Sequence, residues 1–139
     1  MDEIDEVLEG ILSSNYSRII YNETDILKKL SDITLKELRT LEVILKSEKS
    51  GNNNSTNIAG VLGITLGTLT SNIDRLIKKG LVIREKLEGD KRTTVLKLTI
   101  KGKKVLKDYE NEHLKIIRNA LKNLSAKEIA VLESLLNKF

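Results

Sequence analysis

Four polar side chains near the middle of the chain have the types and the spacing needed to read nucleic acid. They are Thr68, Ser71, Asn72 and Arg75. Their spacing of i, i+3, i+4 and i+7 places them on one face of a helix expected over residues 66–79. Such side chains near the front of a helix can bond base edges in the major groove, where Arg pairs best with guanine and Asn with adenine. The opposite face is expected to pack inward through Leu66, Leu69, Ile73, Leu76 and Ile77.

A shorter helix is expected directly before this polar helix. Asn54 or Ser55 can cap its start, and Gly63 can end it. Thr65 can then cap the polar helix. Because Ala59 and Gly63 are four residues apart, the small first residue lets two helices cross closely and the glycine allows a tight turn between them. The Ala-x-x-x-Gly pattern is common by itself, but followed by a two-faced helix it predicts a helix-turn-helix.

A charged hairpin, or wing, is expected after the polar helix. Residues 81–86 and 93–98 have the composition of two strands, and the second shows the alternation of a half-buried strand. The tip between them, residues 87–92, carries Lys91 and Arg92, which could reach a phosphate or the minor groove. A solvated turn is the alternative, but the position of the hairpin directly after the helix-turn-helix favours contact with DNA.

Positive charge is concentrated in the same region. Residues 55–104 hold eleven basic and four acidic side chains, whereas residues 1–46 hold six basic and ten acidic ones, in a chain of net charge +4. This distribution is expected of a protein that binds a polyphosphate, and Lys79 is expected to neutralise a phosphate. Gly67 allows either close approach of the backbone to a phosphate or simple fraying of the first helical turn. The candidate DNA-contacting residues are Ser55, Thr56, Thr65, Gly67, Thr68, Ser71, Asn72, Arg75, Lys78, Lys91 and Arg92.

Composition argues against several other functions. Without Cys the chain has no disulfide, no thiolate nucleophile and no peroxide-sensing thiol. A single His, His113, argues against a metal site, and three Tyr and one Phe are too few to stack unpaired bases. No nucleophile–base pair or Gly-rich phosphate loop stands out, so neither an enzyme nor a bound cofactor is expected.

The chain is expected to be soluble and cytoplasmic, with no membrane partner. No apolar run approaches the roughly 18 residues of a membrane span, and the acidic start MDEIDE is unlike a signal peptide. With 139 residues the chain can bury a substantial core.

The expected fold is mainly α with a small β-hairpin wing. Residues 34–99 are assigned to a winged helix-turn-helix domain, and residues 1–33 and 100–139 to a helical dimerisation region. The first helix is expected to run from about Ile4 to about Leu30, with one apolar face. Packing within the monomer is the alternative, but the terminal helices carry more apolar surface than a small domain can cover, which favours a two-fold dimer. The candidate dimerisation residues are Ile4, Val7, Leu8, Ile11, Leu12, Leu132, Leu135 and Leu136.

Capping signals set the ends of the remaining helices. Thr34 and Glu37 fit a capping box, as do Ser125 and the Glu three residues after it. Thr99 can cap a long helix. The helices expected from these signals cover residues 35–47, 100–124 and 126 onward, and residues 47–54 are expected to form a loop.

These residues resemble a known family. Asp90-x-Arg92 followed by Leu98-Thr99-x-x-Gly102 is similar to the most specific motif of the MarR family of winged-helix regulators. Two weaker similarities are the run 73–82 and the Ala-x-x-x-Gly pattern at 59–63. The resemblance covers almost the whole chain and implies a homodimer on pseudo-palindromic duplex DNA, with recognition helices in successive major grooves. It also implies that Arg92 enters the minor groove and that Asp90 pairs with Arg92 or its surroundings.

Within the family, residues 34–44 and 65–71 look closest to FabT-type repressors of bacterial fatty-acid synthesis. This resemblance implies a ligand-responsive repressor whose effector is a small molecule, an acyl chain or an acyl carrier protein. A winged-helix protein-interaction module without specific DNA binding is the alternative. In the family, ligands bind between the dimer helices and the winged domain. There Tyr16, Ile19, Ile20, Leu38 and Leu41 could form a wall, with plain core as the alternative.

Overall fold

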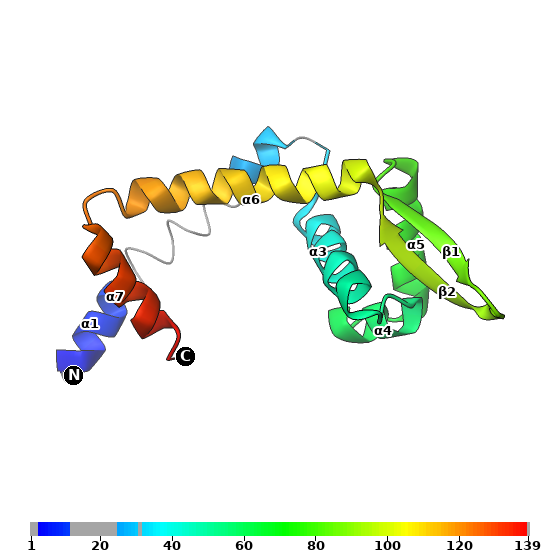
Figure 1. Cartoon of the computed structure of the whole chain (residues 1–139), viewed down its shortest axis with the longest axis horizontal. Helices are drawn as coiled ribbons and strands as arrows, with labels where there is room; N and C mark the ends of the chain where they lie inside the picture. Colours follow the sequence, from blue (N-terminus) through cyan, green and yellow to red (C-terminus); the bar gives the residue numbers. More distant parts are fainter. Residues whose placement is uncertain (1–2, 12–24, 31, 139) are drawn as a thin grey trace. The chain divides into compact units, whose positions relative to one another are not determined.

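The computed structural model describes residues 3–11, 25–30 and 32–138, which are mainly helical with one two-stranded antiparallel hairpin (Figure 1). The named elements are α1 (Glu3–Ile11), α3 (Leu35–Ser50), α4 (Ser55–Leu62), α5 (Leu66–Lys78), β1 (Val82–Leu87), β2 (Asp90–Leu98), α6 (Ile100–Ala120) and α7 (Ala126–Leu136). The chain divides into two compact units, one of residues 27–109 and one of residues 1–26 with 110–139. The expected fold class, a mainly helical winged helix-turn-helix, is confirmed.

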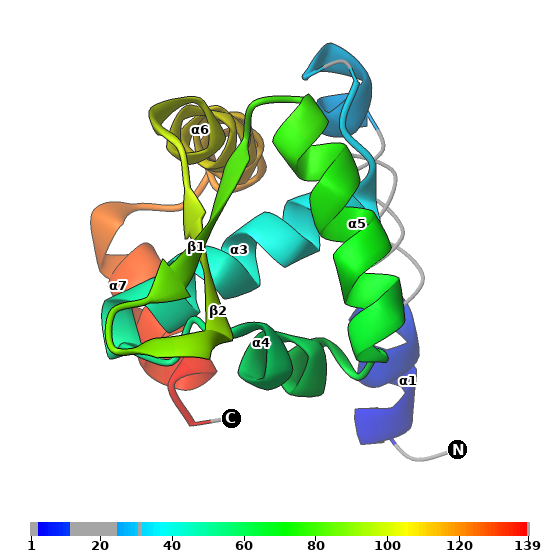
Figure 2. The same ribbon diagram turned by 90° about the vertical axis from the view of Figure 1, so that its right-hand side faces the viewer.

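The core of the unit formed by residues 27–109 joins α3, α4 and α5 to the hairpin, and Figure 2 shows how these elements are arranged. Helices α3 and α5 contribute residues three or four positions apart, α4 contributes an adjacent pair, and β2 contributes the alternate residues Leu96 and Leu98. This core fixes which face of α5 points outward. Its buried members are Leu41, Ile44, Ile58, Ala59, Leu69, Ile73, Leu76, Leu81, Val82, Leu96 and Leu98.

Helix α3 is longer than its sequence pattern predicts. It begins at Leu35, as expected, with the Thr34 hydroxyl accepting the Glu37 N–H at 3.1 Å. It continues to Ser50 and ends at Gly51, whose φ of 77° is left-handed. The prediction of a loop from residue 47 was therefore wrong by three residues. Ser47 is buried, so the helix continues for as long as its inner face is covered.

The hairpin has a shorter tip than predicted. Strand β2 already begins at Asp90, so Glu88 and Gly89 alone form the turn, with Gly89 at a φ of 81°. The pairing register shifts between Lys86, which pairs with Thr94, and Leu87, which pairs with Asp90, so the ladder is irregular near the tip. Residues 91 and 92 consequently lie on a strand and not in a six-residue loop, because left-handed glycine permits a tight turn.

The start of α6 is hydrogen-bonded to the segment that follows α5. The Thr99 hydroxyl donates to the Gly80 carbonyl at 2.6 Å and accepts the Gly102 N–H at 3.0 Å, which confirms Thr99 as the cap of α6. A Cβ on Gly102 would lie 2.2 Å from the Leu81 carbonyl oxygen. Only glycine therefore allows this approach of two backbones. The Leu-Thr-x-x-Gly motif thus forms the joint between the wing and the long helix.

The terminal helices are described in part. Both hydrogen bonds of the capping box between Ser125 and Glu128 are present at the start of α7. Helix α6 ends at Ala120, four residues earlier than predicted, because residues 121–124 form turns before Ser125 caps the next helix. The continuous first helix predicted across residues 12–24 lies outside the described residues. Within the described ranges, no helix is long and apolar enough to cross a membrane.

Candidate nucleic-acid interface

The turn between α4 and α5 has the geometry expected of a helix-turn-helix. Asn54, and not Ser55, caps α4, accepting the Asn57 N–H at 2.8 Å. Gly63 ends the helix with a left-handed φ of 67°, which a residue with a Cβ adopts only with strain. Ala59 is buried in the core cluster that also contains Leu69 and Ile73 of α5. The predicted role of Gly63 in the turn is therefore confirmed, and the burial of Ala59 fits the close helix packing predicted for it.

The inward face of α5 holds the helix against the core. Leu69, Ile73 and Leu76 are each at most 1% exposed, and Ile77 is half-buried. Leu66, however, is 50% exposed, so its prediction as an inward residue was wrong. Leu66 is the first residue of the helix and lies outside the core cluster that takes in Leu69. Periodicity gives the direction of a side chain but not how far the neighbouring elements extend.

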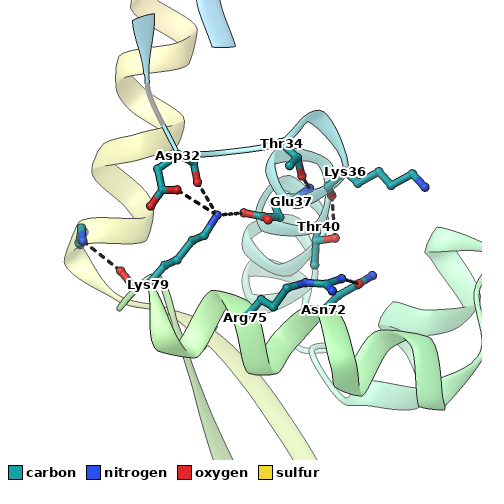
Figure 3. Close-up of polar contacts among 9 residues, drawn as sticks. Asp32, Thr34, Lys36, Glu37, Thr40, Asn72, Arg75 and Lys79 are labelled. Carbon is teal, nitrogen blue, oxygen red and sulfur yellow. Dashed lines mark hydrogen bonds and ion pairs between the residues drawn. The ribbon is translucent and has the colours of Figure 1, made fainter. Parts of the chain in front are cut away.

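The outward face of α5 carries the polar set predicted to read bases. Thr68, Ser71 and Arg75 are exposed and Asn72 is half-buried. The Arg75 guanidinium donates to the Asn72 amide oxygen at 2.5 Å (Figure 3). Since a guanidinium has five N–H donors, this bond orients Arg75 and leaves further donors for a ligand. The arrangement presents two side chains with complementary hydrogen-bonding capacity on one exposed surface.

The N-terminus of α5 is rigidly capped. The Thr65 hydroxyl accepts the Thr68 N–H at 3.1 Å and donates to the Thr68 hydroxyl at 2.9 Å. Gly67 is exposed, and a Cβ there would meet nothing within 4 Å. No local packing therefore requires glycine at position 67, and both interpretations of this residue stay open.

The Asp90 carboxylate organises the start of β2. It accepts the Thr93 hydroxyl at 2.6 Å and the Arg92 N–H at 2.9 Å. These bonds, that from the Thr93 side chain above all, hold the pKa of Asp90 below its ordinary value. Asp90 thus bonds the backbone N–H of Arg92, as the resemblance implied for Arg92 or its surroundings, while the Arg92 side chain is exposed. The Lys91 side chain lies outside the described part of the chain.

An ion pair between α5 and the wing was missed by the sequence reasoning. Arg84 of β1 donates to the Asp74 carboxylate at 2.9 Å. Both side chains are well exposed, so the pair adds little stability. It nevertheless connects α5, the helix expected to read DNA and called the reading helix below, directly to the hairpin. Opposite charges ten residues apart give no periodic signal, so this contact depends on the tertiary structure.

Two lysines at the end of α5 have different surroundings. Lys78 is exposed, as a phosphate contact requires. The Lys79 ammonium instead lies 2.7 Å from the Glu37 carboxylate, and its side chain is 25% exposed. The expectation that Lys79 neutralises a phosphate is therefore withdrawn, because its charge is already paired within the protein.

The remaining candidate contacts lie at the start of α4. Thr56 is exposed, while Ser55 is half-buried with its hydroxyl 3.5 Å from the Thr94 carbonyl. The assignment of these and the other candidate residues to DNA stays a prediction.

The predicted ligand wall lies only in part within the described residues. Leu38 and Leu41 are fully buried, which fits the plain-core alternative, and Tyr16, Ile19 and Ile20 lie outside the described residues. A pocket of about 490 Å³ lies beside the end of α5 and the start of α6. Its lining residues are Leu30, Asp32, Ile33, Lys78, Lys79, Leu81, Lys101 and Val105. Among the described residues, no cluster of three or more His, Cys, Asp or Glu side chains could hold a metal ion.

Comparisons with known proteins agree with this geometry. Residues 33–94 match the model of the MarR family. An uncharacterised HTH-type transcriptional regulator of Bacillus subtilis, YfiV, is 37% identical over 89 residues, which is 63% of this chain and 55% of that protein. The chain thus spans about half the length of the curated relatives it matches.

Solved structures extend the likeness to nearly the whole chain. A MarR family protein from Bacillus stearothermophilus superimposes with a TM-score of 0.77 at 23% identity, covering 99% of this chain and 94% of that one. FabT of Streptococcus pneumoniae, solved in complex with DNA, superimposes with a TM-score of 0.65 at 28% identity, covering 97% and 91%. Sequence and fold therefore agree: residues 33–94 match the MarR family, and the structure has the winged-helix architecture of that family.

Proposed function

We propose that this protein is a transcriptional repressor that binds duplex DNA sequence-specifically. The exposed polar face of α5 carries the proposal, because its bonded Asn72–Arg75 pair lies on the helix that a helix-turn-helix inserts into the major groove. The wing lies beside this helix, connected to it by Arg84 and Asp74. The structural similarity to FabT, a protein solved with DNA, supports the same function.

One chain presents one reading face, so the regulator is proposed to act as a homodimer. In the unit formed by residues 1–26 and 110–139, Ile4 and Val7 of α1 are 68% and 59% exposed. Leu135 and Leu136 of α7 are 50% and 57% exposed. Large apolar side chains this exposed on two helices fit a surface that a second copy covers. The side chains of Leu8 and Ile11, and the whole of Leu12, lie outside the described residues, and Leu132 is half-buried.

The dimer proposal is tested by sedimentation at micromolar concentration. Leu135→Glu should yield monomers, because a carboxylate at an apolar interface loses its hydration. Lys127→Glu, at an exposed position of the same helix, is the matched control and should remain dimeric. A Leu135→Glu protein that sediments like the wild type would exclude α7 from the interface.

DNA binding is tested by selecting sequences from a random duplex library and measuring affinities for the enriched site and for random DNA. Arg75→Ala should cost about 1–3 kcal/mol on the selected site and relax the preference at one base pair. Lys78→Ala should weaken binding to all sequences alike and lower the slope of log affinity against log salt by about 0.9. If no sequence is enriched and no complex forms at low salt, the winged-helix protein-interaction module becomes the better explanation. Repression is tested by measuring expression of a reporter gene placed behind the selected site, which should rise when the gene for this protein is deleted.

A response to a ligand is also proposed, centred on the pocket beside α5. Its lining combines three lysines with four aliphatic side chains and one carboxylate. Lys79 is already paired with Glu37, so Lys78 and Lys101 are the cations that fit an organic acid with an apolar part. Because Lys78 and Lys79 end the reading helix, a ligand there would act directly on the element that binds DNA. Aliphatic and aromatic acids and an acyl carrier protein are the ligands to compare. Lys101→Met should weaken the effect of any acid that uses this pocket.

We further propose fatty-acid synthesis genes as targets. Support comes from the FabT-like stretches at 34–44 and 65–71 and from the structural similarity to FabT of Streptococcus pneumoniae. Sequencing of the genomic DNA bound by the protein in cells tests this assignment. Bound sites confined to promoters of other pathways would reject it without affecting the proposal of DNA binding.

A further inference from the structure

The end of the reading helix is held by a buried ion pair that the DNA-contacting residues do not explain. The Lys79 ammonium donates to the Glu37 carboxylate at 2.7 Å, and the two side chains are only 25% and 10% exposed. Figure 3 shows Lys79 reaching from the end of α5 to Glu37 in the first turn of α3. The pair therefore joins two helices that are far apart in the sequence.

The segment before α3 completes the surroundings of this ammonium. The Asp32 carbonyl accepts a second hydrogen bond from Lys79, and the Asp32 carboxylate lies 4.0 Å away. Asp32 has a φ of 70°, and it is the only residue other than glycine with a positive φ within the described ranges. Such a backbone conformation costs energy and persists only where surrounding contacts offset that cost. The backbone at Asp32 is thus shaped so that its carbonyl faces the end of α5.

The main chain of Lys79 connects to a third element. Its carbonyl accepts the Lys101 ammonium from the first turn of α6 at 3.0 Å. The residue at the C-terminal cap of α5 is therefore tied to α6 by its main chain and to the start of α3 by its side chain. Arg75 lies one turn earlier on the same helix, so any tilt or rotation at Lys79 moves Arg75 as well.

We propose that Lys79, through Glu37, is a positioning residue for DNA reading. The ion pair fixes the last turn of α5 against α3 and thereby sets the angle at which Asn72 and Arg75 meet the bases. Neither Lys79 nor Glu37 needs to touch DNA for this role. The inference rests on the proposed DNA-binding function and assigns to that function two residues beyond its reading surface.

The way in which Glu37→Gln changes DNA binding tests this proposal. Removing a negative charge from a protein that binds a polyanion should strengthen binding if only the overall charge matters. Such a charge effect would raise the affinities for the selected site and for random DNA alike and leave their ratio unchanged. A positioning role predicts instead that Glu37→Gln lowers this ratio about tenfold. Glu42→Gln removes the same charge from the same helix, where Glu42 pairs with exposed Arg39, and should leave the ratio unchanged.

The lysine side is tested by comparing two adjacent residues. Lys79→Met should lower the affinity ratio like Glu37→Gln while leaving the salt slope unchanged, whereas Lys78→Met should lower the slope by about 0.9 with the ratio intact. Combining Lys79→Met with Glu37→Gln should cause no larger loss than the worse single change, because both break one interaction. Lys79→Arg keeps a charged donor and should preserve the ratio even if the Met protein is too unstable to measure.

The results separate the inference from the function on which it rests. A wild-type protein that enriches no DNA sequence would remove the proposed function itself. A wild-type protein that binds specifically while Glu37→Gln behaves like Glu42→Gln would overturn the positioning role alone. A lower salt slope for Lys79→Met would return Lys79 to the phosphate contacts.

Discussion

Replacing Gly102 with alanine tests the joint between the wing and α6. The added Cβ would lie 2.2 Å from the Leu81 carbonyl oxygen, well inside the 3.0 Å below which such contacts are essentially absent from proteins. The nearest atoms belong to the backbone, so no side-chain rotation relieves the clash, and α6 must move away from Leu81. This movement strains the hydrogen bond from the Thr99 N–H to the same oxygen, now 3.0 Å long.

The magnitude follows from two opposing effects. Alanine is favoured over glycine in a helix by about 1 kcal/mol, while overpacking typically costs about 1–3 kcal/mol and a weakened buried hydrogen bond adds to that cost. We expect a net loss of about 2 kcal/mol. Urea denaturation followed by circular dichroism at fixed protein concentration should show a lower midpoint with an unchanged slope.

A matched glycine in another helix provides the control. Gly60 lies within α4 and is exposed, and a Cβ added to it would meet no other atom within 4 Å. Gly60→Ala should therefore stabilise the protein by up to about 1 kcal/mol through helix propensity alone. If Gly102→Ala proved as stable as the wild type, the close backbone approach could not be the reason for glycine at this position.

Two further predictions concern the ends of the reading elements. Thr65→Ala should lower the free energy of unfolding by about 1 kcal/mol because the N-cap of α5 is lost, whereas Thr70→Ala, which removes a hydroxyl bonded only within the helix, should not destabilise the protein. The lowered pKa of Asp90, caused chiefly by the Thr93 hydroxyl, means that its stabilising effect is complete above the ordinary pKa of about 3.9 and is lost as the pH falls through the lower folded value. NMR titration of the Asp90 carboxyl measures this directly, and a midpoint at or above the ordinary value would contradict the hydrogen bonding seen at the wing.

Local signals explain why much of the fold was predictable. The caps Thr34, Thr65 and Ser125 start helices where their hydroxyls accept backbone N–H groups, which depends on residues within three positions. Gly63 and Gly89 mark turns by their conformational freedom. The end of α3 was misjudged because the buried Ser47 belongs to the inner face of the helix, which continues to Ser50 within the polar run.

Local sequence patterns could not predict contacts between residues that are far apart in the chain. Glu37 was identified correctly as the residue three positions after a cap, but its carboxylate pairs with Lys79, forty-two positions away. The sequence likewise suggested Lys79 as a phosphate contact because nothing local showed that its charge was already paired. Leu66 has the periodicity of a core residue yet is half exposed.

The sequence alone determined the two-faced helix at 66–79, the wing that follows it and the polar set Thr68, Ser71, Asn72 and Arg75, because periodicity and capping are local properties. The tertiary structure alone decided which of the neighbouring charges remain free for a ligand. Lys78 and Lys79 are adjacent residues of the same type, so the sequence does not distinguish them. The fold leaves Lys78 exposed and places the Lys79 ammonium against Glu37. The physical reason is that an ion pair depends on distance in space, which chain position does not specify.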